Sequence, residues 1–152
     1  MTEQNKYCYD YPRPALTVDA AVFREHSGIN EVLLIQRKNY PFEGMWALPG
    51  GFVDMDETCE TAVVRELEEE THLKADGLKQ LHTFSALGRD PRGRTVSVTF
   101  YGTVDFDKSS VKGGDDAADA RWFALDNLPP LAFDHVEAVM MAFGKLKNPH
   151  PK

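Results

Sequence analysis

Apolar and polar residues along the chain follow two different periods, and the change of period predicts the elements. Residues 16–23, LTVDAAVF, and residues 32–37, VLLIQR, are β-branched and apolar and lie on either side of a Gly-containing turn. They predict an antiparallel pair of strands. Residues 78–87 and 95–104 are also strand-like and predict a hairpin, and residues 121–124 predict one further short strand.

Helical spacing of apolar residues occurs in two other segments. The first predicts a helix over residues 58–71, with Asp56 as a suitable N-cap. The second predicts a C-terminal helix with Asp134 as N-cap and Glu137 three residues later, the pattern of a capping box. The apolar face predicted for this second helix consists of Val136, Val139, Met140, Phe143 and Leu146.

Strands joined by hairpins and separated by two unequally spaced helices favour an α+β or mixed α/β fold. At 152 residues the chain fits one domain, residues 1–152, in which residues 1–14 are expected to form an arm before the first strand. No apolar stretch approaches the roughly 18 residues of a membrane span, and the N-terminus lacks the pattern of a signal peptide. We therefore expect a cytoplasmic protein without a membrane partner.

Charge and cysteine content narrow the function classes. A formal net charge of −7 disfavours nucleic-acid binding, which depends on Lys and Arg contacts to phosphate. The two cysteines, Cys8 and Cys59, are far apart and suggest neither a disulfide framework nor a thiolate metal site. A phosphate-bearing substrate would therefore need local positive charge, supplied by a metal ion or by a few arginines.

The residues that are candidates for catalysis and metal binding lie on the first predicted helix. Glu66 precedes Glu69 by three residues and Glu70 by four, so the three side chains share one helical face, whereas Glu68 points elsewhere. Repulsion between like charges at this spacing disfavours the helix unless a cation is bound. Mg²⁺ prefers such carboxylate ligands together with substrate phosphates, and Mn²⁺ is the alternative ion. Glycines directly before the helix would let backbone approach a metal or phosphate closely.

This segment resembles the signature box of the Nudix hydrolases. The box reads Gly, five residues, Glu, seven residues, and then Arg-Glu-apolar-x-Glu-Glu-x-Gly-apolar. The matching residues are Gly51, Glu57, Arg65, Glu66, Leu67, Glu69, Glu70 and Leu73. His72 replaces the second glycine, which usually ends the helix in a left-handed conformation, and the sequence leaves the effect of this replacement open. The resemblance extends over roughly residues 16–146 and implies an α/β/α sandwich with a mixed central sheet.

The resemblance also implies roles for the residues of the box. Glu66, Glu69 and Glu70 would be metal ligands, joined by the backbone carbonyl of Gly50. Glu57 and Arg65 would pair and orient the loop and the helix. The catalytic base varies in the family: here it would be Glu69 or an acid in a later loop, for which the candidates are Asp115 and Asp116.

Motifs outside the box look like the ADP-ribose pyrophosphatase branch of the family and the related sensor domains of NAD-metabolism regulators. They predict that the hairpin tip GRDPRGR contributes arginines to a second phosphate or a ribose, and that aromatic rings stack on the adenine. The candidate substrate-binding residues are Arg37, Gly51, Arg89, Arg92, Arg94, Phe42 and Trp46, with Trp122 as a further aromatic.

The leading functional hypothesis is metal-dependent hydrolysis of ADP-ribose to AMP and ribose 5-phosphate. One alternative is a nucleoside triphosphate pyrophosphohydrolase acting on a normal or oxidised nucleotide. Another is a sensor that binds ADP-ribose without cleaving it. Sensors of this kind carry an additional DNA-binding domain, and the few residues after Lys147 disfavour that alternative. The sequence leaves open the true substrate, the catalytic base, the number of metal ions and whether two chains form a homodimer.

Overall fold

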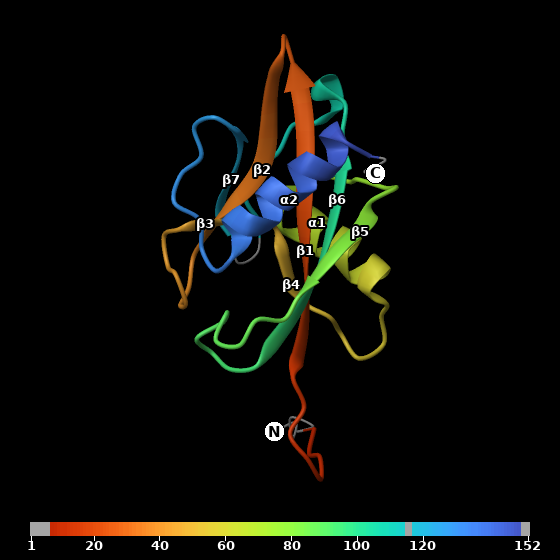
Figure 1. Ribbon diagram of the computed structural model, residues 1–152, viewed down its shortest axis with the longest axis vertical. Helices are drawn as coiled ribbons and strands as arrows, with labels where there is room; N and C mark the ends of the chain where they lie inside the picture. Colours follow the sequence, from red (N-terminus) through yellow and green to blue (C-terminus); the bar gives the residue numbers. More distant parts are fainter. Residues whose placement is uncertain (1–6, 115–116, 150–152) are drawn as a thin grey trace.

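The computed structural model describes residues 7–114 and 117–149 (Figure 1). Within these residues seven strands form one mixed sheet, in which β1 is parallel to β6 and antiparallel to β2 and β4. The path of neighbouring strands is β3-β2-β1-β6-β5, with β7 paired to β2. The strands are β1 (Ala15–His26), β2 (Ile29–Arg37), β3 (Trp46–Ala47), β4 (Gly50–Phe52), β5 (Lys79–Phe84), β6 (Thr95–Thr103) and β7 (Ala117–Ala124). The predicted mixed α/β fold with a mixed sheet is confirmed.

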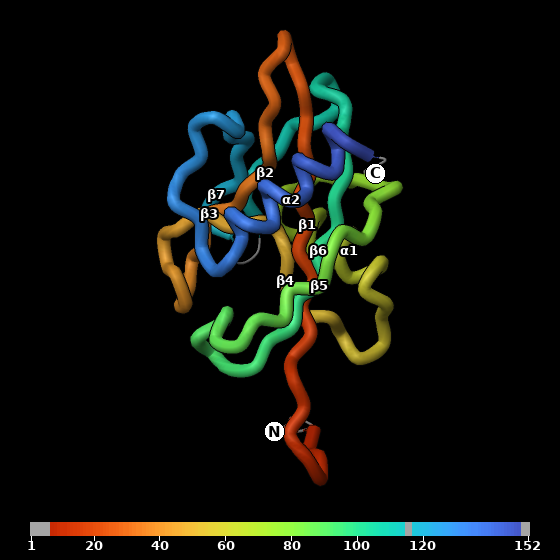
Figure 2. The backbone as a smooth tube through the Cα atoms, in the orientation of Figure 1, coloured from red at the N-terminus to blue at the C-terminus, as the bar shows by residue number. Residues whose placement is uncertain are grey.

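The α-helices of the described residues are α1 (Cys59–Thr71) and α2 (His135–Lys147), and they cover opposite faces of this sheet (Figures 1 and 2). Successive residues of a strand point to opposite faces. Val18, Ala20 and Val22 of β1 accordingly pack in a core with the buried side chains of α1. Ala21 and Phe23 pack in a second core with the buried side chains of α2. The chain therefore forms the predicted α/β/α sandwich, and its central strand is apolar on both sides.

Helix α1 agrees with the sequence prediction except at its N-cap. The hydroxyl of Thr58, not the carboxylate of Asp56, accepts a hydrogen bond from the Thr61 amide at 3.1 Å. Asp56 stands too early, because the first helical residue is Cys59. At the other end His72 adopts the left-handed conformation, with φ 61°, and its amide donates to Glu68 O at 2.9 Å. His72 thus ends the helix where the family has glycine.

Helix α2 corrects two predictions. Asp134 stands at the N-cap position, but its side chain makes no capping bond, because both carboxylate oxygens accept from Arg89. The buried face is also rotated from the predicted one: Val136 and Met140 are about half exposed, at 52% and 48%. The buried residues of the helix are His135, Ala138, Val139 and Ala142.

The remaining connections are mostly as predicted. Strands β5 and β6 form an antiparallel hairpin whose tip is closed by a hydrogen bond from the Gly93 amide to Asp90 O at 3.3 Å. Strand β7 begins at Ala117, earlier than the predicted residue 121, because its pairing with β2 continues past a bulge to Arg37. Within the described residues no helix is long and apolar enough to span a membrane.

Candidate active site

An open cleft of about 380 Å³ lies where the start of α2, the β5–β6 hairpin and the acidic face of α1 meet the sheet. A volume of this size suits a small-molecule ligand. Its lining is Thr17, Asp19, Ile35, Arg37, Lys38, Asn39, Tyr40, Leu48, Gly50, Gly51, Phe52, Asp54, Glu66, Glu69, Glu70, Arg89, Asp90, Arg92, Phe133 and His135. The cleft has an acidic wall and a basic wall.

The acidic wall is formed by the three glutamates that helical spacing predicted to share one face. Glu66, Glu69 and Glu70 all line the cleft, and their side chains are buried to different degrees. Glu70 is 7% exposed, whereas the Glu69 side chain is 42% exposed. Glu68 does not line the cleft and lies 3.6 Å from Lys74 Nζ. The separation of Glu68 from the other three glutamates follows from the helical period alone.

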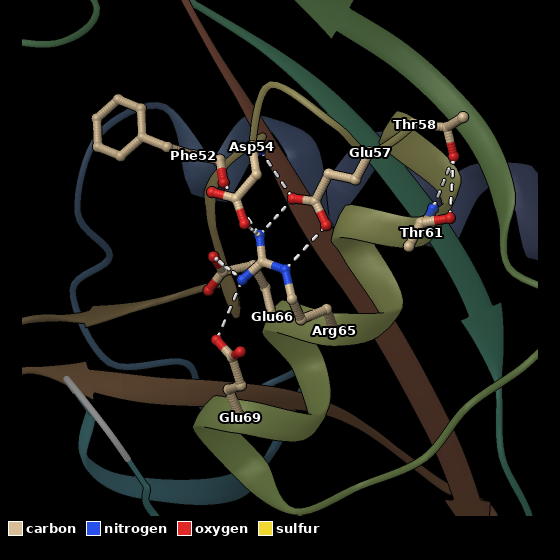
Figure 3. A network of polar contacts seen from close by, with 8 residues as sticks. All are labelled: Phe52, Asp54, Glu57, Thr58, Thr61, Arg65, Glu66 and Glu69. Atoms are coloured by element: carbon tan, nitrogen blue, oxygen red, sulfur yellow. Dashed lines mark hydrogen bonds and ion pairs between the residues drawn. The ribbon is translucent and has the colours of Figure 1, made fainter. Parts of the chain in front are cut away.

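Arg65 joins the loop that precedes α1 to two of these glutamates (Figure 3). Its guanidinium donates to both carboxylate oxygens of Glu57, at 3.0 and 2.5 Å. The same guanidinium donates to Glu66 at 2.9 Å and to Glu69 at 3.1 Å. Glu57 also accepts from the Asp54 amide at 2.8 Å, and hydrogen bonds from Arg65 lower its pKa to about 2. The expected Glu57–Arg65 pair is therefore present, at the centre of a network that positions the acidic wall.

The glycines before the helix lie tightly against acidic side chains. The Gly50 amide donates to Glu70 Oε1 at 2.8 Å. A Cβ atom at Gly51 would lie 2.5 Å from the carboxyl carbon of Glu66, so any side chain there would displace that carboxylate. Burial, followed by repulsion from Glu66 and Asp19, raises the pKa of Glu70 to about 8, although the Gly50 amide opposes this shift. Burial also raises the pKa of Glu66.

The donor set of the acidic wall suits a hard divalent cation. Its three carboxylates line one cleft, and burial raises the pKa of Glu66 and of Glu70 there. A cation there would lower the cost of ionising both groups. As the side chains stand, however, no three acidic, His or Cys groups among residues 7–114 and 117–149 are gathered to hold a metal ion. Arg65 and the Gly50 amide instead donate to one oxygen of each of the three carboxylates.

The basic wall contains two of the three predicted hairpin arginines, together with Arg37. Burial and the neighbouring Arg92 cation lower the pKa of Arg37, which donates through Nε to Pro41 O at 2.6 Å. Arg92 pairs with Asp90 at 2.8 Å, and Arg89 pairs with Asp134 at 2.7 Å. Arg94 lies apart from these residues: it donates to Ser85 O at 2.8 Å within the hairpin and does not line the cleft.

The aromatic residues of the cleft differ from those expected. Phe42 packs edge-on against Phe133 with 4.8 Å between ring centroids, and Trp46 packs against Phe123 at 4.7 Å. Trp122 donates through its indole N–H to Ser109 O at 2.8 Å. None of Phe42, Trp46 and Trp122 lines the cleft, because each is used in packing. The aromatic residues that line it are Tyr40, Phe52 and Phe133.

Sequence reasoning missed several further polar residues of the cleft. Asp19, Asp90 and His135 are buried, and all three line the cleft. Asp19 lies in a strand that reads as apolar, and His135 follows an expected cap residue, so neither stands out in a motif. The candidate bases Asp115 and Asp116 lie outside the described residues.

Comparison with known proteins assigns the family. The model of the NUDIX domain matches residues 13–142 of the chain, and the chain belongs to the Nudix family. The curated relatives include an ADP-ribose pyrophosphatase from Methanocaldococcus jannaschii, 46% identical over 138 residues that cover 91% of this chain and 78% of the relative. The family match and this similarity confirm the predicted enzyme class, a Nudix-type pyrophosphohydrolase.

The chain is also similar to proteins whose names indicate a regulatory role. The chain is 38% identical over 143 residues to the ADPR responsive transcriptional repressor NtrR of Acinetobacter baylyi, covering 91% of this chain but 57% of the repressor. Among solved structures, the NUDIX domain of Shewanella oneidensis NrtR complexed with ADP ribose superimposes with a TM-score of 0.84 at 36% identity. That superposition covers 91% of this chain and 94% of the domain. The Shewanella protein has also been solved with a 27mer DNA.

Proposed function

We propose that the cleft binds ADP-ribose and hydrolyses its diphosphate linkage, giving AMP and ribose 5-phosphate. The observation that carries the proposal is the meeting of the three glutamates of α1 with Arg37 and Arg92 in one cleft. The 46% identity to an ADP-ribose pyrophosphatase supports this substrate.

The basic wall suits binding of the diphosphate, and the acidic wall suits removal of a proton from the attacking water. A diphosphate brings negative charge, which the guanidinium groups of Arg37 and Arg92 attract on the basic wall. Arg37 is suited to this role, because burial and repulsion from Arg92 both disfavour its positive charge and a bound anion would offset both effects. On the acidic wall a carboxylate accepts a proton from the attacking water. One P–O bond forms to that water, the bridging P–O bond breaks, and each product leaves as a phosphomonoester.

We infer that Mg²⁺, or alternatively Mn²⁺, is held by Glu66, Glu69 and Glu70 with the carbonyl of Gly50. When bound, a divalent ion supplies charge neutralisation at the phosphate oxygens and acidifies water. The chain itself orients the ligands: the hydrogen bonds between Arg65 and Glu57 hold α1 against the loop that precedes it. Either Glu69 or one of Asp115 and Asp116 is proposed as the base, and Glu69 is the most exposed of the three wall glutamates.

A second candidate is a sensor that binds ADP-ribose without cleaving it. The specific observation in its favour is the similarity to the NUDIX domain of NrtR, whose structure contains ADP ribose. This chain has the three glutamates Glu66, Glu69 and Glu70, and their presence favours the hydrolase over the sensor. The predicted cytoplasmic location and the absence of a nucleic-acid partner stay predictions, and whether two chains form a homodimer stays open.

A substrate panel with the purified chain and Mg²⁺ tests the proposal. We expect kcat/KM for ADP-ribose to exceed that for nucleoside triphosphates, with AMP and ribose 5-phosphate in equal amounts. Faster turnover of nucleoside triphosphates, including oxidised ones, would instead identify a triphosphate pyrophosphohydrolase. Binding of ADP-ribose in calorimetry without product over hours would identify the sensor. Omitting the metal and adding a chelator should abolish turnover, whereas undiminished turnover would contradict the metal assignment.

A further inference from the structure

The backbone between β3 and β4 is held by side chains from both helices. The segment Leu48–Gly50 contains two amide donors, because Pro49 has no N–H. The Gly50 amide donates to Glu70 of α1 at 2.8 Å. The Leu48 amide donates to Nδ1 of His135, the first residue of α2, at 3.0 Å. The segment therefore links the acidic wall of the cleft to the helix on the opposite face of the sheet.

His135 belongs to a buried polar group beneath the cleft. Its Nδ1 accepts from the Leu48 amide and therefore carries no proton, which places the proton of the neutral ring on Nε2. This nitrogen lies 3.6 Å from Asp19 Oδ2. The Ser97 hydroxyl donates to the same oxygen. The carboxylate of Asp19 thus selects the ring tautomer that can accept from Leu48.

Asp19 is suited to this task by its position. Its carboxylate is buried, accepts a hydrogen bond from the Ser97 hydroxyl and lies beside Nε2 of His135. Asp19 also stands directly opposite Gly50 in the antiparallel pairing of β1 with β4. A Cβ atom on Gly50 would overlap the Asp19 carboxylate, so the side chain and the glycine backbone are in close contact.

We propose that His135 is a positioning residue for the acidic wall. By holding the Leu48 amide it sets the backbone so that the Gly50 amide meets the Glu70 carboxylate, and Asp19 keeps the ring in the required tautomer. This inference deepens the proposed function and rests on it for its kinetic part. Neither His135 nor Asp19 is assigned a bond-making role.

Two substitutions of His135 separate positioning from packing. In His135→Asn the side-chain oxygen lies near the position of Nδ1 and can still accept from Leu48. In His135→Gln the longer side chain reaches toward Asp19 and leaves the Leu48 amide without its acceptor. We expect His135→Asn to retain kcat within about 3-fold, and His135→Gln to lose about 10- to 100-fold, the range typical for an outer-shell partner. KM should change less than kcat in both variants.

Asp19→Asn provides an independent test in case His135→Gln does not fold. An amide at position 19 can donate to Nε2, which favours the tautomer with its proton on Nδ1 and breaks the bond from Leu48. We expect Asp19→Asn to lower kcat by about 10-fold. The double variant Asp19→Asn with His135→Asn should recover most of that loss, because an asparagine at position 135 needs no tautomer control.

The ¹H–¹⁵N resonance of the Gly50 amide, recorded without substrate or metal, gives a readout independent of the reaction. It should be unchanged in His135→Asn and should move upfield in His135→Gln as the bond to Glu70 lengthens. His82→Asn, at an exposed histidine of β5, is the matched control and should leave kcat and the resonance unchanged.

Three results would overturn the proposal: an unmoved Gly50 resonance in His135→Gln, equal impairment of His135→Asn and His135→Gln, or no recovery in the double variant. If ADP-ribose is not the substrate, the Gly50 resonance still decides the role of His135, while the substrate panel alone decides the function.

Discussion

Helices α1 and α2 have the same length, 13 residues, yet their N-termini are held in different ways. Thr58 caps α1 with its own hydroxyl, through a bond that spans three residues. Asp134, a residue type at least as good at an N-cap, makes no capping bond in α2. Its carboxylate instead accepts two hydrogen bonds from Arg89, 45 residues away. A local preference is followed in one helix and overridden by a tertiary ion pair in the other.

The two sides of the cleft differ in the same way, in the sequence separation of the contacts that hold them. The acidic wall depends on short-range contacts, such as the bond from Arg65 to Glu57 across eight residues. The start of α2 depends on long-range contacts, such as the bond from Leu48 to His135 across 87 residues. Apart from the Glu70 carboxylate, which we propose that His135 positions through Gly50, the acidic wall should therefore tolerate changes elsewhere in the fold, whereas the α2 side should be sensitive to the ion pair and the buried histidine that hold it.

The largest expected effect is on the acidic wall. Glu70→Gln keeps the side-chain shape and its bond from the Gly50 amide but removes a charge. We expect kcat for the best substrate to fall by about 10³-fold or more, because metal binding and charge stabilisation are lost together. Circular dichroism and the free energy of unfolding should show a folded protein. Glu68→Gln, on the other side of the same helix, is the control and should turn over at nearly the wild-type rate; equal losses would contradict the assignment of the wall.

The next effect concerns the ion pair on the α2 side. Arg89→Met should lower the free energy of unfolding by about 3 kcal/mol in urea titrations, because it leaves the Asp134 carboxylate partly buried without its partner. The Arg89 side chain is 5% exposed, so solvent screens this pair little. Adding Asp134→Asn should recover about half of the loss. Additive losses in the double variant would show that the two side chains are not energetically coupled.

A smaller effect is expected at the cap of α1. Thr58→Ala should lower the free energy of unfolding by about 1 kcal/mol, the usual contribution of an N-cap hydroxyl. Asp56→Ala is the matched control and should change the free energy of unfolding by less than about 0.5 kcal/mol, as expected for a surface substitution. A larger loss in Asp56→Ala than in Thr58→Ala would restore the cap predicted from sequence.

The smallest effect is expected where α1 ends. His72→Gly should raise the free energy of unfolding by about 0.5 kcal/mol, because glycine adopts the left-handed conformation without strain but gains freedom in the unfolded chain. Turnover should be unchanged, since His72 does not line the cleft. A fall in kcat beyond the change in folded fraction would assign His72 a role that its position does not suggest.

The sequence predicted those parts of the site that local chemistry determines. Helical period alone placed Glu66, Glu69 and Glu70 on one face and Glu68 on another. The resemblance to the Nudix box correctly paired Glu57 with Arg65. In both cases the interacting groups are close in sequence, so pattern and geometry coincide.

The aromatic and basic residues were harder to predict because burial is a property of the whole fold. Nothing in the sequence distinguishes Phe42, which packs against Phe133, from Tyr40, which lines the cleft and is 72% exposed. The sequence likewise does not distinguish Arg94, which donates to backbone carbonyls of the hairpin, from Arg92, which pairs with the Asp90 carboxylate. His135 becomes visible only when β1, the β3–β4 segment and α2 are brought together.

The parallel pairing of β1 with β6 also affects the order in which the protein assembles. Residues Thr95–Thr103 are synthesised after the whole of α1, yet β6 is the strand that completes the sheet beside β1. Until then the apolar side of α1, including the fully buried Leu67, has only part of the surface that will cover it. Non-local pairing of this kind slows folding. In the nascent chain the acidic residues of α1 are therefore present before the strand that completes their enclosure in the candidate active site.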